Sequence, residues 1–207
     1  AHSTKNESLP RLMKTSTVSV KRYTAILAML LDDSSLKSVL HAIVRLIEDK
    51  NFGCKSSILL LSPDGQRLLK GAAPSISDNY NNAIHGIEIG AKIGSCGAAA
   101  FLSQRVIVED IANHENWIPF RELPLSVGLK SCWSEPIFGS DGQVLGTFAM
   151  YYNEIKSPTE ADLELIAEAA LLASLAIERD RSSRFQRLCG GIFSQMPLAL
   201  LITDANG

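Results

Sequence analysis

Two short turns, each set between apolar runs, restrict this chain more than any other feature. The turn Gly-Ser-Asp-Gly at 139–142 joins an apolar run at 130–138 to another at 143–152. A second turn, Ser-Pro-Asp-Gly at 62–65, lies between two further apolar runs. Turn residues of this kind between strand-like segments predict β-hairpins. Because a tight turn makes its two strands run in opposite directions, the chain is expected to form an antiparallel sheet.

Helices are predicted on both sides of these strands. Apolar residues recur at helical spacing over 18–31 and again over 36–50. Between the hairpins the pattern predicts a short helix at 77–84, a small-residue helix at 94–103, a strand at 106–108 and a loop with a short helix at 113–125. This order of elements indicates an α+β fold, in which helices are layered on an antiparallel sheet.

A long helix follows the second hairpin. Ser157 is expected to cap it, with Pro158 at the first helical position and Glu160 completing a capping box, and the helix is expected to reach about Arg184. Five apolar residues lie at steps of three and four along it: Leu163, Ile166, Ala170, Ala173 and Ile177. This narrow stripe suits packing on the sheet, and it also suits a homodimer in which two copies of the helix pair.

Composition and charge restrict the function classes. Of the 207 residues, 46% are apolar and 20% are charged, which provides enough apolar surface for a packed core. The formal net charge is −2 and no basic patch dominates, so no nucleic-acid partner is expected. The apolar runs are too short to span a membrane, so no membrane contact is expected. Four scattered cysteines without a CxxC pair favour a reducing, cytoplasmic setting.

The segment IGSCGAAAF at 93–101 places Cys96 between two glycines at the predicted start of a helix. Backbone amides at a helix start favour a thiolate, so Cys96 is a candidate for a reactive thiol. The small residues around it also allow a helix to approach a sheet closely. In that arrangement Cys96 is a small buried residue that lines a pocket.

Three segments together resemble a GAF domain of the type found in bacterial sensor proteins. They are IGSCGAAAFLSQRVIVEDIANHENW, LKSCWSEPIFGSDGQVLGTFAMYY and SPTEADLELIAEAALLASLAIER. The resemblance implies a sheet of five to six antiparallel strands, with the N- and C-terminal helices on one face and the ligand pocket, with its helices and loops, on the other. It also implies that the terminal helices form a parallel dimer.

The end of the chain, FQRLCGGIFSQMPLALLITDANG, resembles the opening of a PAS domain. The expected organisation is therefore a disordered leader at 1–17, a GAF domain with its terminal helices at 18–181, and a linker with the truncated start of a PAS domain at 182–207. The chain is then a piece of a longer signalling protein, with a PAS domain and an output domain downstream.

In a GAF domain the loop at 113–125 would cover the pocket. Trp117 and Phe120 would supply apolar walls, and Arg121 would supply a cation for an anionic ligand. Alternatively, the two rings fill an empty pocket and Arg121 points outward. The three residues are candidate ligand contacts, together with Cys96.

Two further candidate ligand contacts, Trp133 and Glu135, share one face of their predicted strand. A carboxylate within a packed strand needs a partner, so Glu135 is expected to meet either a ligand or an internal arginine.

One GAF-type enzyme, free methionine-(R)-sulfoxide reductase, has a cysteine in a setting that matches Cys96. That enzyme needs a further cysteine in the loop before the next strand, and the loop HENWIPFRELPLSVG holds none. The next cysteine, Cys132, is predicted inside the following strand. Because the catalytic partner is missing, no catalytic residue is assigned, and the reductase is kept only as an alternative.

His85 and His114 lie near the expected pocket, but no Cys, His, Asp or Glu stands at metal-ligand spacing to either. They are interpreted as exposed loop residues, and no metal is assigned. The chain has no Cys-His pair, which argues against a bilin-binding photoreceptor. The cofactor, if there is one, stays unspecified.

The resemblance implies a cytoplasmic sensor of an unidentified small molecule or of redox state, which signals through the C-terminal helix of a dimer. Cyclic di-GMP synthesis or hydrolysis is the first expectation for the output domain, and a histidine kinase is the alternative. A structural dimerisation module without a ligand is a further alternative. This fragment itself is expected not to be an enzyme.

Overall fold

The computed structural model describes residues 21–195, with side chains as far as Cys189. The expected leader at 1–17 lies outside the described residues, as do the strand and turn that end the PAS-like segment.

Six strands form one antiparallel sheet in the order β3-β2-β1-β6-β5-β4. Their bounds are β1 Lys55–Leu61, β2 Arg67–Ala72, β3 Ile87–Glu88, β4 Val106–Val108, β5 Ser131–Phe138 and β6 Val144–Tyr152. The helices are α2 Leu36–Lys50, α3 Asp78–Ala83, α4 Gly94–Leu102, the 3₁₀ helix η1 Glu115–Trp117, α5 Glu122–Ser126 and α6 Glu160–Gln195. Residues 21–31 form a further helix before α2. Both predicted hairpins are present, as β1–β2 and β5–β6, and the predicted fold class is confirmed.

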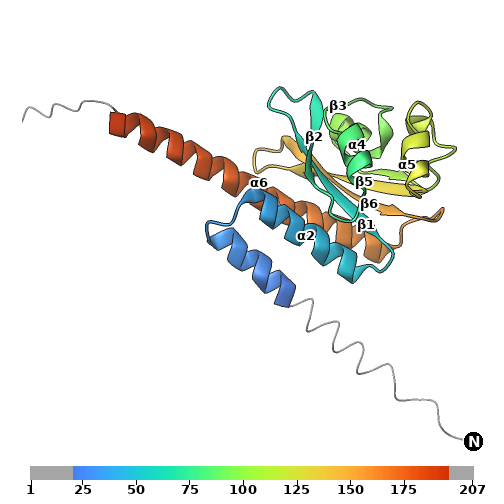
Figure 1. The fold of residues 1–207 in the computed structure, drawn as a ribbon, viewed down its shortest axis with the longest axis horizontal. Helices are drawn as coiled ribbons and strands as arrows, with labels where there is room; N and C mark the ends of the chain where they lie inside the picture. Colours follow the sequence, from blue (N-terminus) through green and yellow to red (C-terminus); the bar gives the residue numbers. More distant parts are fainter. Residues whose placement is uncertain (1–20, 196–207) are drawn as a thin grey trace, which may run out of the picture.

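Helices cover both faces of the sheet (Figure 1). On one face α2 and α6 lie side by side, and their apolar residues form a first core with Ile58, Trp133 and Phe148 of the sheet. On the other face α3, α4, η1 and α5 lie over a second core, which includes Cys132 and Tyr151 of the sheet. The terminal helices are thus separated by the sheet from the smaller helices and loops, as predicted.

The cap of α6 differs from the predicted one, and the helix begins two residues later. The Thr159 hydroxyl accepts from the Asp162 backbone N–H (3.2 Å), and the Asp162 carboxylate accepts from the backbone N–H (2.9 Å) and the hydroxyl (2.8 Å) of Thr159. This reciprocal pair is a capping box, so Thr159 takes the place expected of Ser157. Asn51 Nδ2 also donates to Asp162 (2.6 Å), which ties the start of α6 to the end of α2.

The far end of α6 also differs from the prediction. The helix continues unbroken beyond Arg184 to Gln195, and its last part projects away from the domain (Figure 1). Just before this extension, the Arg179 guanidinium donates to the backbone carbonyl of Met29 in the first helix, and to those of Asp32 and Ser34 in the segment that joins this helix to α2. Neither α6 nor any other helix within residues 21–195 combines the length and the apolar character that a membrane span needs.

The predicted apolar stripe of α6 packs inside its own chain. Ile166, Ala170, Ala173 and Ile177 are buried in the first core, and Leu163 is half-buried. Of the two arrangements that the stripe allows, packing on the sheet is the one that the structure shows. The large apolar side chains that α6 exposes are different ones: Leu171, Leu175, Phe185 and Leu188.

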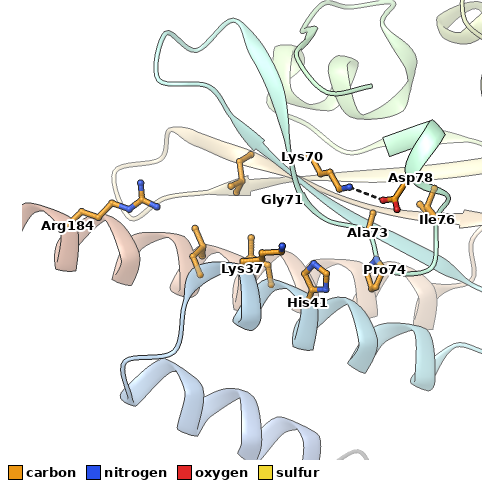
Figure 2. A pocket seen from close by; sticks show the side chains of 12 residues that line it. Lys37, His41, Lys70, Gly71, Ala73, Pro74, Ile76, Asp78 and Arg184 are labelled. Atoms are coloured by element: carbon orange, nitrogen blue, oxygen red, sulfur yellow. Dashed lines mark hydrogen bonds and ion pairs between the residues drawn. The ribbon is translucent and has the colours of Figure 1, made fainter. Parts of the chain in front are cut away.

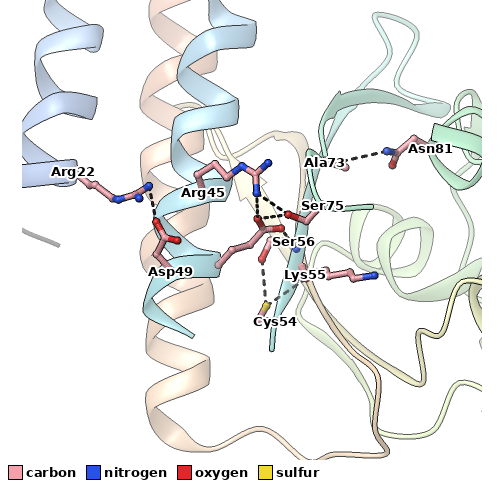
Figure 3. A network of polar contacts seen from close by, with 10 residues as sticks. Arg22, Arg45, Asp49, Cys54, Lys55, Ser56, Ala73, Ser75 and Asn81 are labelled. Carbon is pink, nitrogen blue, oxygen red and sulfur yellow. Dashed lines mark hydrogen bonds and ion pairs between the residues drawn. The ribbon is translucent and has the colours of Figure 1, made fainter. Parts of the chain in front are cut away.

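A polar network fixes α2 to its neighbours (Figure 3). The Glu48 carboxylate accepts from the Ser75 hydroxyl (2.7 Å) and from Arg45 (3.3 Å), and Arg45 also donates to Ser75 (2.9 Å). On another side of α2, Arg22 pairs with Asp49 and attaches the first helix. Arg45 is therefore held by the domain itself, although it lies on the surface.

Candidate functional site

A cavity of about 250 Å³ opens on the second face of the sheet. It lies between the start of α4, the segment from α3 to β3, and the loop that holds η1 and α5. Most of its walls are aromatic or aliphatic, and its lining includes Leu59, Tyr80, Cys96, Trp117, Phe120 and Tyr151. A concave apolar site with a few polar groups is typical of small-molecule binding.

The start of α4 forms one wall of this cavity because its residues are small. Gly94 has a φ of 56°, a left-handed conformation that favours glycine, and a Cβ there would lie 3.4 Å from the Trp117 ring. The Trp117 indole N–H donates to the Ser95 hydroxyl (3.1 Å), which in turn donates to the Cys132 carbonyl (3.2 Å). These bonds hold the loop, the helix start and β5 together.

Thiols and hydroxyls gather beneath α4. Cys96 Sγ lies 3.6 Å from the Tyr151 hydroxyl, and it lies within hydrogen-bonding reach of the Cys132 thiol and of the hydroxyls of Ser134 and Thr147. The Ser134 and Thr147 hydroxyls are fully buried and have no further hydrogen-bond partner in the described part of the chain. Because buried hydroxyls are normally paired, these two have unused hydrogen-bonding capacity.

These contacts set the pKa values of the two thiols. Hydrogen bonding from Cys132, helped by the hydroxyls of Ser134, Tyr151 and Thr147, outweighs burial and lowers the pKa of Cys96 to about 6. Burial raises the pKa of Cys132 and of Tyr151 well above their ordinary values, and the charge on Cys96 adds to both shifts. Cys96 is therefore the thiol of the pair that loses its proton first.

Three of the predicted ligand contacts meet in the cavity. Cys96, Trp117 and Phe120 line it, and they come from α4 and from the loop expected to cover the pocket. The Arg121 side chain does not line the cavity. Its guanidinium donates to the Ala112 carbonyl (3.1 Å), and 44% of its side chain is exposed. The loop thus offers the cavity two aromatic rings, and the Arg121 cation points elsewhere.

Trp133 and Glu135 lie on the opposite face of the sheet from the cavity. Side chains alternate along β5, so both residues face the terminal helices, where Trp133 is buried in the first core. The Glu135 carboxylate forms an ion pair with Arg105, which also donates to the Leu163 carbonyl of α6 (3.4 Å). Glu135 therefore meets an internal arginine, and neither residue is brought to the cavity.

The two histidines of this region make backbone contacts. His85 borders the cavity, and its Nδ1 accepts from the Lys70 backbone N–H (3.1 Å). His114 caps η1 by accepting from the Asn116 backbone N–H (3.2 Å). Within residues 21–195, no group of three or more His, Cys, Asp or Glu side chains is placed to hold a metal ion.

Pattern alone does not identify the polar cluster beneath α4. Its residues are Cys132 and Ser134 of β5, and Thr147 and Tyr151 of β6, of which Tyr151 lines the cavity. Cys132 stands directly opposite Tyr151. A signal was present, because the alternation of each strand assigns these residues to one face. The missing information was the position of α4, which brings Cys96 down onto that face.

The GAF domain family model matches residues 33–178. The chain belongs to the GAF domain family. A curated relative, the methyl sulfide methyltransferase-associated sensor of Methanosarcina acetivorans, is 36% identical to this GAF domain chain over 179 residues. The match covers 83% of the chain but 18% of the relative, so the chain spans about a fifth of that protein's length. The family and this sensor relative together support a role in signal sensing.

Solved structures show the same GAF fold. A domain of a two-component sensor histidine kinase protein from Sinorhizobium meliloti aligns with a TM-score of 0.62 at 20% identity, covering 74% of this chain and 97% of that one. Free methionine-R-sulfoxide reductase from Neisseria meningitidis, in complex with its substrate, aligns with a TM-score of 0.60 at 18% identity, covering 88% of this chain and 97% of that one. At these identities the likeness shows the fold alone.

Proposed function

We propose that this GAF domain senses a small organic molecule in the cavity at the start of α4, within a cytoplasmic signalling protein. The observation that carries the proposal is a cavity walled by aromatic rings, with Cys96 and Tyr151 in its lining. On the same face of the sheet lie the buried hydroxyls of Ser134 and Thr147, which have no partner besides Cys96 in the described part of the chain. Leaving such groups unpaired costs free energy, which a ligand with a polar group recovers.

The size and lining of the cavity restrict the ligand. A volume of about 250 Å³ holds roughly eight non-hydrogen atoms, at the ~30 Å³ that a water molecule occupies in the liquid. The walls are apolar and Arg121 points away, so a neutral molecule fits better than an anion. The relative's name links that sensor to a methyl sulfide methyltransferase. A methyl sulfide is small and neutral, and its sulfur is a weak hydrogen-bond acceptor, so dimethyl sulfide is the first ligand to test.

Strand β5 connects the cavity to α6 in this proposal. On the cavity face, Trp117 is linked to β5 through the Ser95 hydroxyl. On the opposite face, Glu135 of β5 pairs with Arg105, which contacts the Leu163 carbonyl of α6. A ligand that moves Trp117 therefore acts on a strand whose other side holds the start of the output helix. The expected response is a population shift between two positions of α6.

In the proposed assembly, α6 pairs with α6 of a second copy. The exposed Leu171, Leu175, Phe185 and Leu188 offer the apolar surface for this contact, in place of the stripe that is buried in the domain. A PAS domain and an output domain would follow α6. Cyclic di-GMP turnover remains the first proposal for the output and a histidine kinase the alternative.

Two hydroxyl variants test the ligand proposal against a matched control. Native mass spectrometry of the purified chain is expected to reveal a retained small molecule, and added dimethyl sulfide is expected to raise the melting temperature. Replacement of Ser134 by Ala or Thr147 by Val should reduce either effect. Ser131→Ala is the control, because the Ser131 hydroxyl is also buried and unpartnered but belongs to the opposite face of β5. Equal effects in all three variants would show that the ligand binds elsewhere.

Redox sensing is a second candidate function, which the meeting of Cys96 and Cys132 favours. In this scheme the Cys96 thiolate attacks a peroxide and becomes a sulfenic acid, with release of water. The Cys132 thiol then displaces a second water and closes a disulfide, so that two electrons and two protons reach the peroxide. Peptide mapping after peroxide treatment should show the Cys96–Cys132 link, and Cys132→Ser should leave a sulfenic acid that dimedone traps. Absence of both products would reject this function.

Two alternatives stay open to direct test. Turnover of free methionine sulfoxide by this chain with a thiol reductant would identify a reductase. A cavity that retains no molecule, with Ser134 and Thr147 paired only to ordered water, would favour a structural dimerisation module.

A further inference from the structure

A second cavity, a cleft, lies at the junction of α2, β2 and α6, and the start of α3 borders one end of it (Figure 2). Its volume is about 650 Å³, within the range of small-molecule sites. Figure 2 shows the side chains that line it. Arg184 of α6 reaches over one end, the ion pair of Lys70 and Asp78 (3.2 Å) closes the other, and Lys37 and His41 of α2 lie between them.

Positive charge gathers around this cleft although the chain as a whole has a formal net charge of −2. Lys37, Lys70 and Arg184 line it, and Asp78 is the carboxylate of the lining. Lys70 is paired with Asp78, and Arg184 with Asp180 (2.7 Å) on its own helix. Lys37 has no carboxylate partner among the described residues, and the first turn of α2, where it stands, contains no acidic residue. The positive end of the helix dipole therefore adds to the charge of Lys37.

The pKa of His41, which lines the cleft, reflects the surrounding positive charge. Burial lowers the pKa of His41 below its ordinary value, and the neighbouring charges of Lys37, Arg45 and Lys70 lower it further. Arg45 bonds to Glu48 and Ser75 and does not line the cleft. Lys37 and Lys70 do line it. The imidazole is thus neutral at pH 7 in a cleft that favours negative charge.

Part of the lining of the cleft is apolar. It includes Leu36 and Leu40 of α2, Leu60 of β1 and Ile76 of the loop after β2. A lining that is partly apolar and partly cationic fits a molecule that has an anionic group at one end and a hydrocarbon body at the other.

We propose that this cleft binds a small organic anion, such as a phosphate monoester with an apolar body, whose charged group lies between Lys37 of α2 and Arg184 of α6. Arg184 stands on the part of α6 that projects beyond the domain, whereas Lys37 belongs to the domain. Such a ligand would join the projecting helix to the domain body. The cleft is therefore a second input to α6, and its lining shares no residue with that of the cavity at the start of α4.

Phenyl phosphate is the probe, and the His41 ring signals in nuclear magnetic resonance spectra are the readout. His41→Asn assigns these signals among the four histidines of the chain. A bound dianion stabilises the imidazolium, so saturating phenyl phosphate should raise the pKa of His41. Inorganic phosphate, which lacks the apolar body, should bind more weakly. Phenol, which lacks the charge, should leave the pKa unchanged.

Charge-removing variants decide where the anion binds. Lys37→Gln and Arg184→Gln should each weaken phenyl phosphate binding by about fivefold, the effect of losing one partly exposed ion pair. Arg22→Gln is the matched control, because Arg22 is an exposed cation on a neighbouring helix that pairs with Asp49 away from the cleft; its affinity should equal that of the unmodified chain. Absence of a His41 response to millimolar phenyl phosphate would overturn the proposal. So would equal affinities in all three variants, or phenol binding as tightly as phenyl phosphate.

Discussion

Trp117 and Ser95 are joined by a hydrogen bond of 3.1 Å from the indole N–H to the hydroxyl oxygen. The Ser95 hydroxyl is fully buried and gives its own proton to the Cys132 carbonyl at 3.2 Å. A single side chain therefore uses its oxygen as acceptor toward the loop and its proton as donor toward the sheet. The aromatic wall of the cavity is positioned by this hydroxyl, and the hydroxyl is positioned by the first turn of α4.

Ser95→Ala is expected to destabilise the domain by about 1–3 kcal/mol, because it leaves the buried indole N–H of Trp117 without a partner. The free energy of unfolding from urea denaturation measures the effect. Ser131→Ala removes a buried hydroxyl that has no partner, so its cost should be clearly smaller. Equal costs would mean that packing, and not the hydrogen bond, holds Trp117.

Cys96 is expected to react with iodoacetamide at pH 7.5 at least tenfold faster than Cys54. Hydrogen bonding lowers the pKa of Cys96 to about 6, whereas burial raises the pKa of Cys54 to about 11. At pH 7.5 the thiolate, which is the reactive form, dominates at Cys96 and is scarce at Cys54. The Cys96 rate should fall as the pH drops through about 6. Mass-mapped alkylation over a pH series measures both rates, and equal rates would contradict the assigned thiolate.

Glu135→Gln should destabilise the domain by about 1–3 kcal/mol, because Arg105 then lies largely buried without its carboxylate partner. The Glu135 side chain is 17% exposed, whereas that of Glu88, paired with Arg67, is 70% exposed. Glu88→Gln is therefore the matched control and should change stability little. Urea denaturation of both variants measures the two losses of unfolding free energy. Equal losses would show that the Arg105 pair is no stronger than a surface pair.

The contribution of Asp162 to stability is expected to disappear in acid. Burial alone would raise the pKa of Asp162, but hydrogen bonds from Thr159 and Asn51 outweigh it and lower the pKa below the ordinary value of 3.8. A lowered pKa in the folded state means stability that is fully present above the unfolded pKa and is lost as the pH falls through the folded pKa. Wild type should therefore exceed Asp162→Asn in unfolding free energy at pH 6, and the difference should shrink below about pH 4. A constant difference would show that the carboxylate charge is not the cause.

Phe185→Ser combined with Leu188→Ser should weaken self-association of the chain by at least tenfold, if α6 pairs through its exposed apolar residues. Sedimentation equilibrium measures the dissociation constant. Phe52→Ser provides the control, since Phe52 is also exposed but lies in the turn between α2 and β1. A dimer that is unaffected by the double variant would use another surface.

The sequence pattern predicted the helices and strands better than it predicted what packs against each of their faces. Both hairpins and the small helix at α4 are present because turn residues and hydrophobic spacing are local signals. Alternation along β5 correctly separated Cys132 from Trp133. It did not show which of the two faces carries the cavity. Alternation divides the residues of a strand into two sets, but it does not show what either set faces.

The stripe on α6 illustrates the same limit for a helix. Steps of three and four between Ile166 and Ile177 mark one apolar side, and such a side packs equally well on a sheet or on a second helix. Only the position of α2 and the sheet shows that the domain itself buries this side. The start of α6 was misplaced for a different reason, since Ser157 and Thr159 are both capping residues and the reciprocal contact with Asp162 decides between them.

The unbroken course of α6 from Glu160 to Gln195 has a mechanical consequence. Its 36 residues span about 54 Å at a rise of ~1.5 Å per residue, much of it beyond the last contact with the domain. If the helix pivots near Leu163, where Arg105 touches it, a tilt of roughly 6° displaces the far end by about 5 Å. Hence a change in the cavity that is too small to alter the fold becomes a displacement comparable to one helical turn at the place where a following domain would attach.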